Sequence, residues 1–293
     1  MTKKQKILLS KIDSFKDHPF HVNNDESLKE LANSIKENGL YTPLTVRLKE
    51  DGRYELISGH RRKAAMELLG ITETEAYVKE LTNEEATIEM VDSNMYREKI
   101  LPSEKAYAYK MKYDAIKHQG RTSDHDGPKL STEKIGKDSN ESSTNVKRYI
   151  RLTNLIPELL QLVDDTVLKD KRTALTMGLL PAVELSYLNK EEQKLVYMGI
   201  TYEDLTPSHG QAKQLRKLSN EGNITFDSVE EILCKSKGNQ QEQISFNKER
   251  IEKVLPTELL KRDKRYIEQY IIKAIENYKQ QEIERGDVYD LDM

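Results

Sequence analysis

Two arginines at the start of an expected helix could bind an anion. In the segment YELISGHRRKAA, Tyr54–Ile57 reads as a short strand and Ser58-Gly59 as a tight turn, and helical spacing of apolar residues begins at Arg61. The helix would begin with Arg61 and Arg62, although the positive end of a helix dipole favours negative charge. A bound anion would resolve this conflict by accepting hydrogen bonds from backbone N–H groups and from both guanidinium groups. The alternative is a basic helix start that is only solvated.

A second pair of helices could bind DNA. Ser131 and Ser142 can each cap a short helix, and a turn at Ser139–Glu141 separates them, which fits a helix-turn-helix. The stretch Ser142–Thr153 has three basic residues and no acidic one. Small polar side chains at its start would meet base edges, and the basic ones behind them would meet phosphates. The DNA-facing candidates are Ser142, Ser143, Thr144, Asn145, Lys147, Arg148 and Arg151. An ordinary helical hairpin is the alternative.

Short strands and covering helices are expected around the first of these segments. Asn24 or Asp25 can cap a helix that Gly39 ends, and Asp51-Gly52 is a hairpin signal. The other expected elements are strands over residues 7–12, Tyr41–Leu48 and Glu75–Lys79, a helix from the Thr82-x-x-Glu85 capping box to about Tyr96, and a long helix to about His118. This pattern predicts a small α/β unit.

Only helices are expected after this unit. They are predicted at Leu155–Val163, at Leu180–Leu188, at Glu191–Met198, after Pro207-Ser208 and at Asp227–Cys234. Lys235–Glu242 reads as a linker, and Arg262–Glu284 as a helix whose wide apolar stripe would pack on its own domain or on a second copy. We therefore predict an α+β, mostly helical protein with domains over residues 1–118, 119–236 and 237–293.

The composition excludes several classes of protein. A third of the 293 residues are charged and 36% are hydrophobic, which suits several small helical units better than one large core. No apolar run is long enough for a membrane span, and the N-terminus lacks a signal-peptide pattern. Cys234 is the single cysteine, so we expect no disulfide framework and a reducing, cytoplasmic compartment. The net charge of −3 leaves room for a local basic surface but argues against coating nucleic acid by bulk charge.

Three stretches of the chain resemble the ParB partition family. Ile57–Ala64, ISGHRRKA, is similar to the phosphate-binding box G-E-R-R-x-R-A. Leu28–Arg47 resembles the first box of the family and Asp92–Ala106 resembles its E-N-x-Q-R box, and a helix-turn-helix pattern follows. The resemblance covers roughly residues 7–235, and the G-H-R-R form of the central box resembles relatives on mobile elements.

The resemblance implies a nucleotide-gated clamp on DNA. In this family the N-terminal domain binds CTP with Mg²⁺, and nucleotide binding and hydrolysis gate the closure of a dimer. By matching position, Ser58, Gly59, Arg61 and Arg62 would hold the phosphates, Gly39 and Pro43 would shape the pocket beside the base, and Asn94 and Arg97 would close the phosphate side. The implied partners are a centromere-like double-stranded DNA site, a ParA-type ATPase and a second copy of the chain, at the nucleoid.

The sequence departs from the family at two positions. His60 and Ser93 stand where the boxes have glutamates that hold the metal and prepare hydrolysis, and Mg²⁺ prefers carboxylate and phosphate oxygens. Asn94 remains a candidate metal ligand. We therefore expect CTP binding, and we leave Mg²⁺ dependence, CTP hydrolysis and the catalytic residues open.

Two other functions stay open. The same N-terminal fold occurs in nucleases and kinases, so a nuclease or phosphoryl-transfer enzyme is one alternative. A transcriptional repressor that uses only the helix-turn-helix is the other. The sequence shows no clustered acidic residues of the kind that a two-metal nuclease needs.

Overall fold

The computed structural model describes residues 3–97, 99–120, 128–169 and 175–235, together with ten isolated residues between 255 and 281. Contacts divide the chain into two units, Met1–Lys237 and Gly238–Met293. Apart from Lys235, the predicted linker over residues 235–242 lies outside the described residues, and so does much of the predicted helix over 262–284, although Ile267, Tyr270 and Ile271 are described as helical. The predicted division into three domains stays a prediction.

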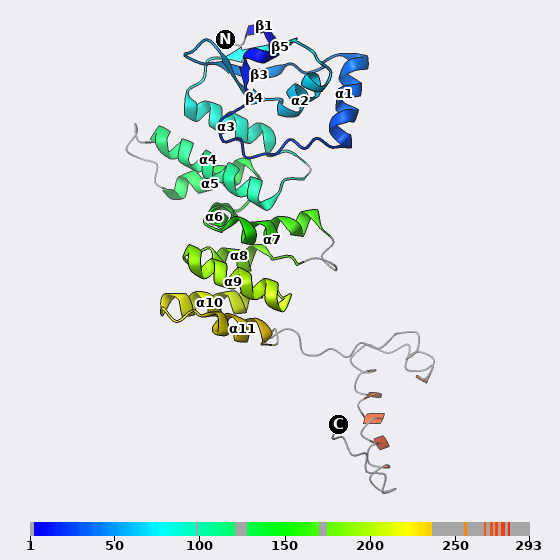
Figure 1. The fold of residues 1–293 in the computed structure, drawn as a ribbon, viewed down its shortest axis with the longest axis vertical. Coiled ribbons are helices and arrows are strands. Elements are labelled where there is room, and N and C mark those ends of the chain that lie inside the picture. The colour runs from blue at the N-terminus through cyan, green and yellow to red at the C-terminus, as the bar shows by residue number, and fades with distance from the viewer. Residues whose placement is uncertain are drawn as a thin grey trace. The chain divides into compact units, whose positions relative to one another are not determined.

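A mixed five-stranded sheet forms the N-terminal part of the first unit (Figure 1). Its strands are β1 (Lys3–Leu8), β2 (Ile12–Asp13), β3 (Leu44–Leu48), β4 (Tyr54–Ser58) and β5 (Glu73–Lys79), in the order β1-β5-β3-β4-β2. β1 and β4 pair antiparallel with β5 and β3, whereas β3–β5 and β2–β4 are parallel. The hairpin predicted at Asp51-Gly52 is confirmed, because Gly52 has φ +76° between β3 and β4.

Two strand predictions need correction. Residues 7–12 do not form one strand: β1 ends at Leu8, the short 3₁₀ helix η1 (Leu9–Lys11) follows, and β2 pairs at the opposite edge of the sheet. The sheet curls because these three residues join its two edge strands. The strand predicted from Tyr41 begins only at Leu44, because the Arg62 guanidinium binds the carbonyl oxygens of Thr42 and Pro43 and holds this segment in a loop.

Four helices complete this part of the unit. They are α1 (Glu26–Asn38), α2 (His60–Leu68), α3 (Asn83–Asn94) and α4 (Pro102–Gly120). Asp25 caps α1 and Thr82 forms the predicted capping box with Glu85. α1 packs on α2, α3 packs on β4, and α4 packs on α3 on one side and on later helices on the other. The long helix α4 therefore belongs to both parts of the unit.

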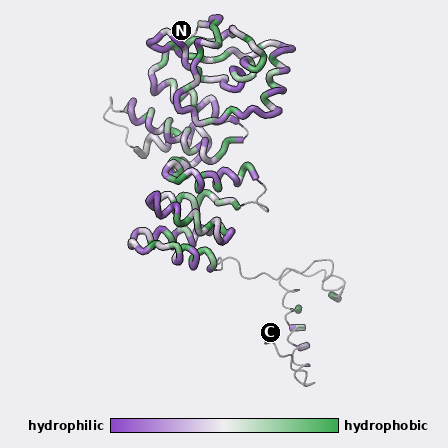
Figure 2. Tube along the Cα trace, in the orientation of Figure 1, coloured by the Kyte–Doolittle hydropathy of each residue, from purple (hydrophilic) through white to green (hydrophobic). Residues whose placement is uncertain are grey.

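The rest of the unit is helical throughout its described residues. Its helices are α5 (Pro128–Asp138), α6 (Ser143–Leu152), α7 (Pro157–Leu168), α8 (Leu179–Leu185), α9 (Lys190–Glu203), α10 (His209–Asn220) and α11 (Phe226–Cys234). Ser131 does not cap α5 as predicted, because α5 begins at Pro128, whose fixed φ and missing N–H suit a first turn. Hydrophobic and hydrophilic residues share each helix, as one-sided burial requires (Figure 2).

A buried lysine joins α4 to its neighbours. Lys112 is 1% exposed, and its Nζ lies 2.5 Å from Oδ1 of Asp92 on α3 and 2.7 Å from Oδ2 of Asp138 on α5. The two ion pairs of Lys112 thus connect α3 of the N-terminal part to α5, the first helix of the helix-turn-helix. None of the described helices has both the length and the apolar character of a membrane span.

Candidate functional site

The N-terminus of α2 is an uncapped helix end. Gly59, the residue before it, has φ +107°, and no side chain caps the helix. A Cβ on Gly59 would lie 2.5 Å from Cδ2 of Leu44, so a glycine is needed both for the backbone angle and for the close approach of β3. The first backbone hydrogen bond of the helix runs from the N–H of Lys63 to the Gly59 carbonyl. The N–H groups of residues 60–62 are therefore available to an anion.

The two arginines of this turn extend in different directions. Arg61 donates from Nη2 to Oγ of Ser27, in the first turn of α1. Arg62 donates from Nη1 to the carbonyl oxygens of Thr42 and of Pro43, the latter at 2.9 Å. Burial lowers the pKa of the Arg62 guanidinium, which nevertheless stays charged. Arg61 thus borders the start of α1, while Arg62 fixes the loop between Gly39 and β3.

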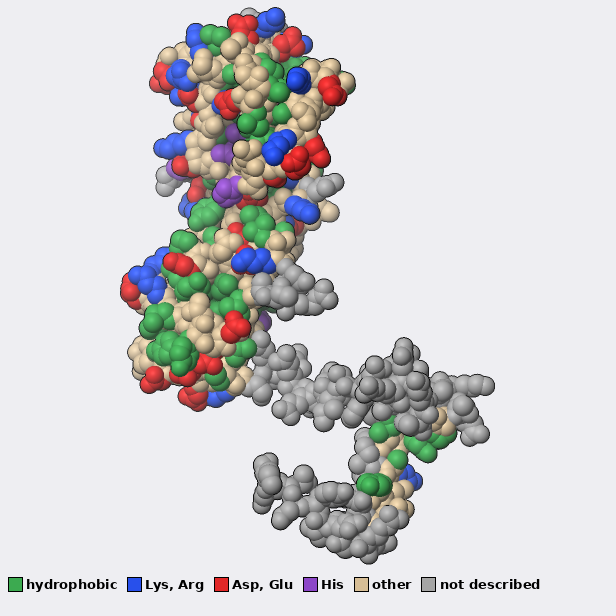
Figure 3. Space-filling model, turned by 45° about the vertical axis from the view of Figure 1, so that its right-hand side comes forward, with side chains coloured by type: hydrophobic (Ala, Val, Ile, Leu, Met, Phe, Trp, Pro, Cys, Tyr) green, Lys and Arg blue, Asp and Glu red, His purple; other side chains and the backbone are tan. Residues whose placement is uncertain are grey.

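A pair of stacked histidines lies beside this helix end. The rings of His60 and His18 are 3.7 Å apart between centroids, at an angle of 32°. Nδ1 of His18 lies 2.7 Å from the Phe20 carbonyl oxygen, so this nitrogen carries the proton, because a carbonyl can only accept. Nε2 of His18 and both ring nitrogens of His60 are buried without a hydrogen-bond partner among the described residues. Figure 3 shows histidine side chains gathered on one face of the N-terminal part.

Both histidines are neutral because they are removed from water. The pKa of His60 is lowered to about 3, first by burial, then by the repulsion that a protonated His18 would exert, and by the positive charges of Arg97 and Lys63. The pKa of His18 is lowered to about 4, chiefly by burial. Nearby cations add to the effect of burial at both rings, which indicates a region of positive potential.

The segment after α3 brings a third arginine to the same place. The Arg97 guanidinium lies 5.3 Å from the centroid of the Phe20 ring. Burial lowers its pKa; Glu104 opposes this effect and the charge of Arg61 adds to it. Glu104 is itself held by the backbone N–H groups of His21 and Leu101, at 2.7 and 3.0 Å. The Glu104 carboxylate therefore lies in a region where positively charged side chains, including Arg97 and Arg61, predominate.

The donors near this corner do not suit Mg²⁺. Ser93 and Asn94 both turn inward, donating to the Met90 carbonyl at 2.9 and 2.8 Å from Oγ and Nδ2. The carboxylate of Asp92 is bound to Lys112, and that of Glu89 lies 2.6 Å from Nζ of Lys79. Among the described residues no group of three or more His, Cys, Asp or Glu side chains could hold a metal ion. Protein sites usually bind Mg²⁺ through one or two carboxylates together with phosphate and water oxygens, and the carboxylates of Asp92 and Glu89 are already paired with lysines, so the side chains do not fit Mg²⁺.

The structure therefore brings most of the predicted nucleotide residues into one corner and turns two of them away. Ser58, Gly59, His60, Arg61 and Arg62 form the turn, and Arg97 approaches it, whereas Ser93 and Asn94 bond within α3. Sequence reasoning missed His18, Phe20, Ser27, Thr42 and Glu104. These residues lie far from the turn in sequence, and only Thr42 and Glu104 fall inside stretches that the family resemblance singles out.

The helix-turn-helix has the expected form. Ser142 caps α6 by accepting from the Asn145 N–H at 3.1 Å, and Asn140 in the turn has φ +55°. A Cβ on Gly136 would lie 2.5 Å from the Glu141 carbonyl oxygen, so α5 and the turn approach each other closely. Glu141 also forms an ion pair with Lys105 of α4. The turn is thus fixed from two sides.

The predicted DNA-facing side chains of α6 differ in their freedom. Thr144 and Lys147 are exposed, and Arg148 donates to Oδ1 of Asn145 at 3.1 Å. Arg151 instead donates to Oγ and O of Ser186, at 3.1 and 2.9 Å, and lies over the Tyr187 ring. Ser143 bonds to Thr132 of α5. The first part of α6 is therefore more accessible to DNA than its end. Arg151, at that end, connects α6 to the residue that follows α8.

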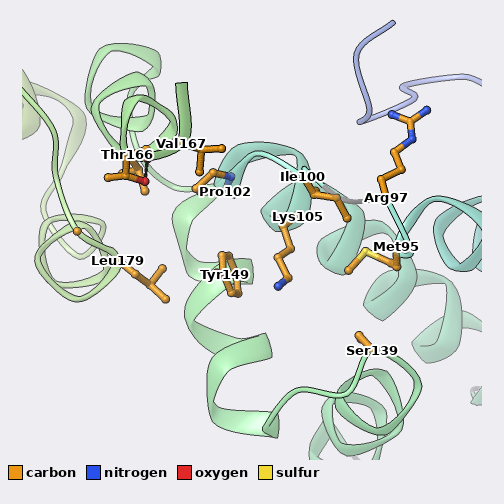
Figure 4. A pocket seen from close by; sticks show the side chains of 12 residues that line it. Met95, Arg97, Ile100, Pro102, Lys105, Ser139, Tyr149, Thr166, Val167 and Leu179 are labelled. Atoms are coloured by element: carbon orange, nitrogen blue, oxygen red, sulfur yellow. Dashed lines mark hydrogen bonds between the residues drawn. The ribbon is translucent and has the colours of Figure 1, made fainter. Parts of the chain in front are cut away.

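A cavity of about 520 Å³ lies between α4, α6 and α7, and it shares Arg97 with the corner at the start of α2. Lys105, Tyr149 and Thr166 contribute to its lining, and the Lys105 ammonium points toward its interior (Figure 4). Arg97 reaches its edge, but its guanidinium points away from the cavity in Figure 4. A separate groove of about 650 Å³ runs along α6, between Lys110, Lys147 and Asn154.

Acidification is expected to destabilise the first unit through the histidine pair. Both folded pKa values lie below 6.5, the ordinary value, so below pH 6.5 the unfolded chain binds protons that the folded chain does not. The free energy of unfolding should then fall as the pH falls toward 4, at pH 5 by about 2 kcal/mol from His60 and by less from the partly exposed His18. Urea unfolding at pH 7, 6 and 5 measures this loss. His60→Gln should reduce it and His209→Gln on α10 should not; equal losses in all three proteins would contradict the assignment.

Comparison with known proteins identifies the N-terminal part. The family model of the ParB N-terminal domain matches residues 1–95. The chain is 37% identical over 140 residues to the chromosome-partitioning protein Spo0J of Thermus thermophilus, covering 48% of this chain and 47% of that protein. It is 29% identical over 186 residues to the chromosome-partitioning protein ParB of Myxococcus xanthus, covering 64% and 58%. The chain thus spans about half the length of these relatives.

Solved structures show a weaker overall likeness. The ParB of Caulobacter crescentus complexed to the centromeric parS site has 18% identity and a TM-score of 0.41, covering 74% of this chain and 99% of that one. The same protein complexed with CTP-gamma-S has 20% identity and a TM-score of 0.31, covering 73% and 98%. At these scores neither likeness bears on what this chain binds. The sequence match concerns the part of the chain that holds the sheet and the uncapped α2: residues 1–95 match the family model of the ParB N-terminal domain.

Proposed function

We propose that this chain is a site-specific DNA-binding partition protein whose N-terminal domain binds CTP. The observation that carries the proposal is the uncapped N-terminus of α2, with Gly59 before it and Arg61 in its first turn, inside the residues that match the ParB N-terminal domain. Free N–H groups and guanidinium groups at a helix start suit a chain of phosphates. The helix-turn-helix of α5 and α6, with Lys147 exposed, supplies a surface for double-stranded DNA.

The two proposed sites share α4. This helix packs on α3, which precedes Arg97, and on α5 and α6. Lys112 and Lys105 connect it to both sides through ion pairs with Asp92, Asp138 and Glu141. A nucleotide that shifted α3 would therefore also act on the helix-turn-helix, which supports a nucleotide-gated clamp on DNA at the nucleoid.

The proposed partners are a centromere-like DNA site of the parS kind, a ParA-type ATPase and a second copy of the chain. The apolar stripe that includes Ile267, Tyr270 and Ile271 is the proposed dimer contact, because Tyr270 is 42% exposed on a helix that a second copy could cover. CTP hydrolysis is not part of the proposal. The described side chains near α2 and α3 do not fit a Mg²⁺ site. A two-metal nuclease would need such carboxylate ligands, so these side chains do not favour a nuclease either.

Replacing Arg61 by alanine tests the nucleotide site. CTP affinity should fall by about 1.5–3 kcal/mol, which is the worth of a hydrogen bond to a charged group. Binding of a parS duplex without nucleotide should stay unchanged, because Arg61 lies outside the helix-turn-helix. Titration calorimetry with CTP and fluorescence anisotropy with labelled parS measure the two affinities.

Lys63→Ala is the matched control for this test. Lys63 is on the same helix, but its Nζ is 2.6 Å from Oε1 of Glu67, one turn further on. The control loses the same charge without losing the proposed contact, so it should keep most of the CTP affinity. The nucleotide assignment is wrong if both variants bind CTP as well as the unmodified protein does. Equal affinity of that protein for parS and a scrambled duplex would refute site-specific DNA binding.

A further inference from the structure

His60 is an unusual buried group. It is 8% exposed, and neither of its ring nitrogens has a hydrogen-bond partner among the described residues. Folded proteins pair nearly all buried polar atoms, because an unpaired one loses its bonds to water without replacement. An unpaired ring inside a well-packed corner therefore indicates a ligand that completes it.

The position of His60 indicates the charge of that ligand. It is the first residue of the nine-residue helix α2, at the uncapped end with the free N–H groups. His18 stacks on its ring, and the charged groups around the pair are Arg97, Lys63 and Glu104, with the titratable His21 beside them. Arg61 and Arg62 follow on the same helix. With one carboxylate against these cations and a helix N-terminus, the corner selects an anion.

The corner lacks free carboxylates of the kind that commonly hold Mg²⁺ at a phosphate site. Mg²⁺ usually shares a phosphate with one or two carboxylates. Here Asp92 and Glu89 are bound to Lys112 and Lys79, and Ser93 and Asn94 turn to the Met90 carbonyl. The His60 imidazole, in contrast, has no hydrogen-bond partner among the described residues.

We propose that His60 takes up a proton when the corner binds a diphosphate or triphosphate group, and that the resulting imidazolium neutralises phosphate charge in place of a divalent cation. This inference rests on the proposed nucleotide site. The proton comes from water and adds to the free lone pair of the ring. The new N–H then donates to a phosphate oxygen, and the proton returns to water when the ligand leaves; no covalent bond of the ligand changes.

The stacked arrangement limits the uptake to one proton. Two imidazolium rings with centroids 3.7 Å apart would repel each other strongly, so the His18–His60 pair titrates as a unit. His18 already uses its Nδ1 proton on the Phe20 carbonyl, whereas His60 has both nitrogens free for a ligand. Linkage then requires binding to tighten as the pH falls, by up to about tenfold per pH unit for one proton.

Titration calorimetry with the full chain tests this inference. CTP and inorganic tripolyphosphate are titrated at pH 7 in two buffers of different ionisation enthalpy, each with EDTA or with Mg²⁺. The expected heats differ between the buffers by the equivalent of up to one proton, and the affinity in EDTA stays within a few-fold of that in Mg²⁺. His60→Gln should lose this proton uptake and bind more weakly. His209→Gln should retain it. Titration of the ligand itself is common to all three proteins and cancels in the comparison.

A second measurement uses only the unmodified protein, in case His60→Gln does not fold. Carbon-labelled histidine allows the ring signals to be followed by NMR at pH 7. One buried ring should move to the imidazolium position when tripolyphosphate saturates the corner. Binding without proton uptake, an unchanged uptake in His60→Gln, or a loss of affinity in EDTA that Mg²⁺ restores would each overturn the inference. Failure of both CTP and tripolyphosphate to bind under any condition would instead refute the proposed nucleotide site itself.

Discussion

Replacing Lys112 by alanine is expected to lower the free energy of unfolding of the first unit by roughly 2–4 kcal/mol. The Lys112 ammonium is almost completely buried between Asp92 of α3 and Asp138 of α5. Its loss would leave two carboxylates facing each other and a void where the side chain was. The two aspartates are 42% and 39% exposed and can regain water, which keeps the expected loss below that of a fully buried pair. Urea unfolding followed by circular dichroism measures it.

Two further variants separate charge from packing. Lys110→Ala removes a lysine from the same helix that pairs with Asp114 one turn away and is 44% exposed, so its effect should stay below about 1 kcal/mol. Lys112→Met keeps the buried volume without the charge and should recover part of the loss. Equal stability of the Lys110 and Lys112 alanine variants would show that Lys112 does not hold α3, α4 and α5 together.

The second large effect is expected at the helix-turn-helix. The combined variant Asn145→Ala, Lys147→Ala and Arg148→Ala should weaken binding to a parS duplex on the order of 100- to 1000-fold, because base and phosphate contacts are lost together. The slope of log affinity against log salt should become shallower by about two units, since two cations are removed. Val146 and Leu152 keep α6 in the core, so the fold should survive. Fluorescence anisotropy across a salt series measures both quantities.

A control with the same change in charge makes this test specific. Lys194→Ala with Lys217→Ala also removes two positive charges, from side chains that are 60% and 79% exposed on α9 and α10. That variant should bind parS nearly as well as the unmodified protein. If the α6 variant and the control have the same affinity and salt slope, α6 does not read DNA.

Short-range patterns in the sequence are sufficient for much of the local structure. The caps at Asp25, Thr82 and Ser142 depend on residues three positions apart, and the hairpin depends on Asp51-Gly52. The turn before α2 likewise follows from Gly59 and the change of period after it. These interactions were predicted correctly because both partners stand in the same few residues of the chain. The ParB resemblance rests on such segments and is confirmed for residues 1–95.

Contacts between distant segments decided the rest. His60 meets His18, 42 positions before it in the chain, and no local pattern marks either as buried. The sequence predicts Arg62 at a phosphate, and only folding shows that its guanidinium also donates to the Thr42 and Pro43 carbonyls. Likewise, the sequence does not show that the Asp92 carboxylate forms an ion pair with Lys112 of α4, which competes with metal binding. The sequence alone thus determined where helices, turns and basic residues occur. Only packing between separate elements determined which charges are buried, paired or left open to a ligand, because desolvation and charge pairing depend on neighbours in space.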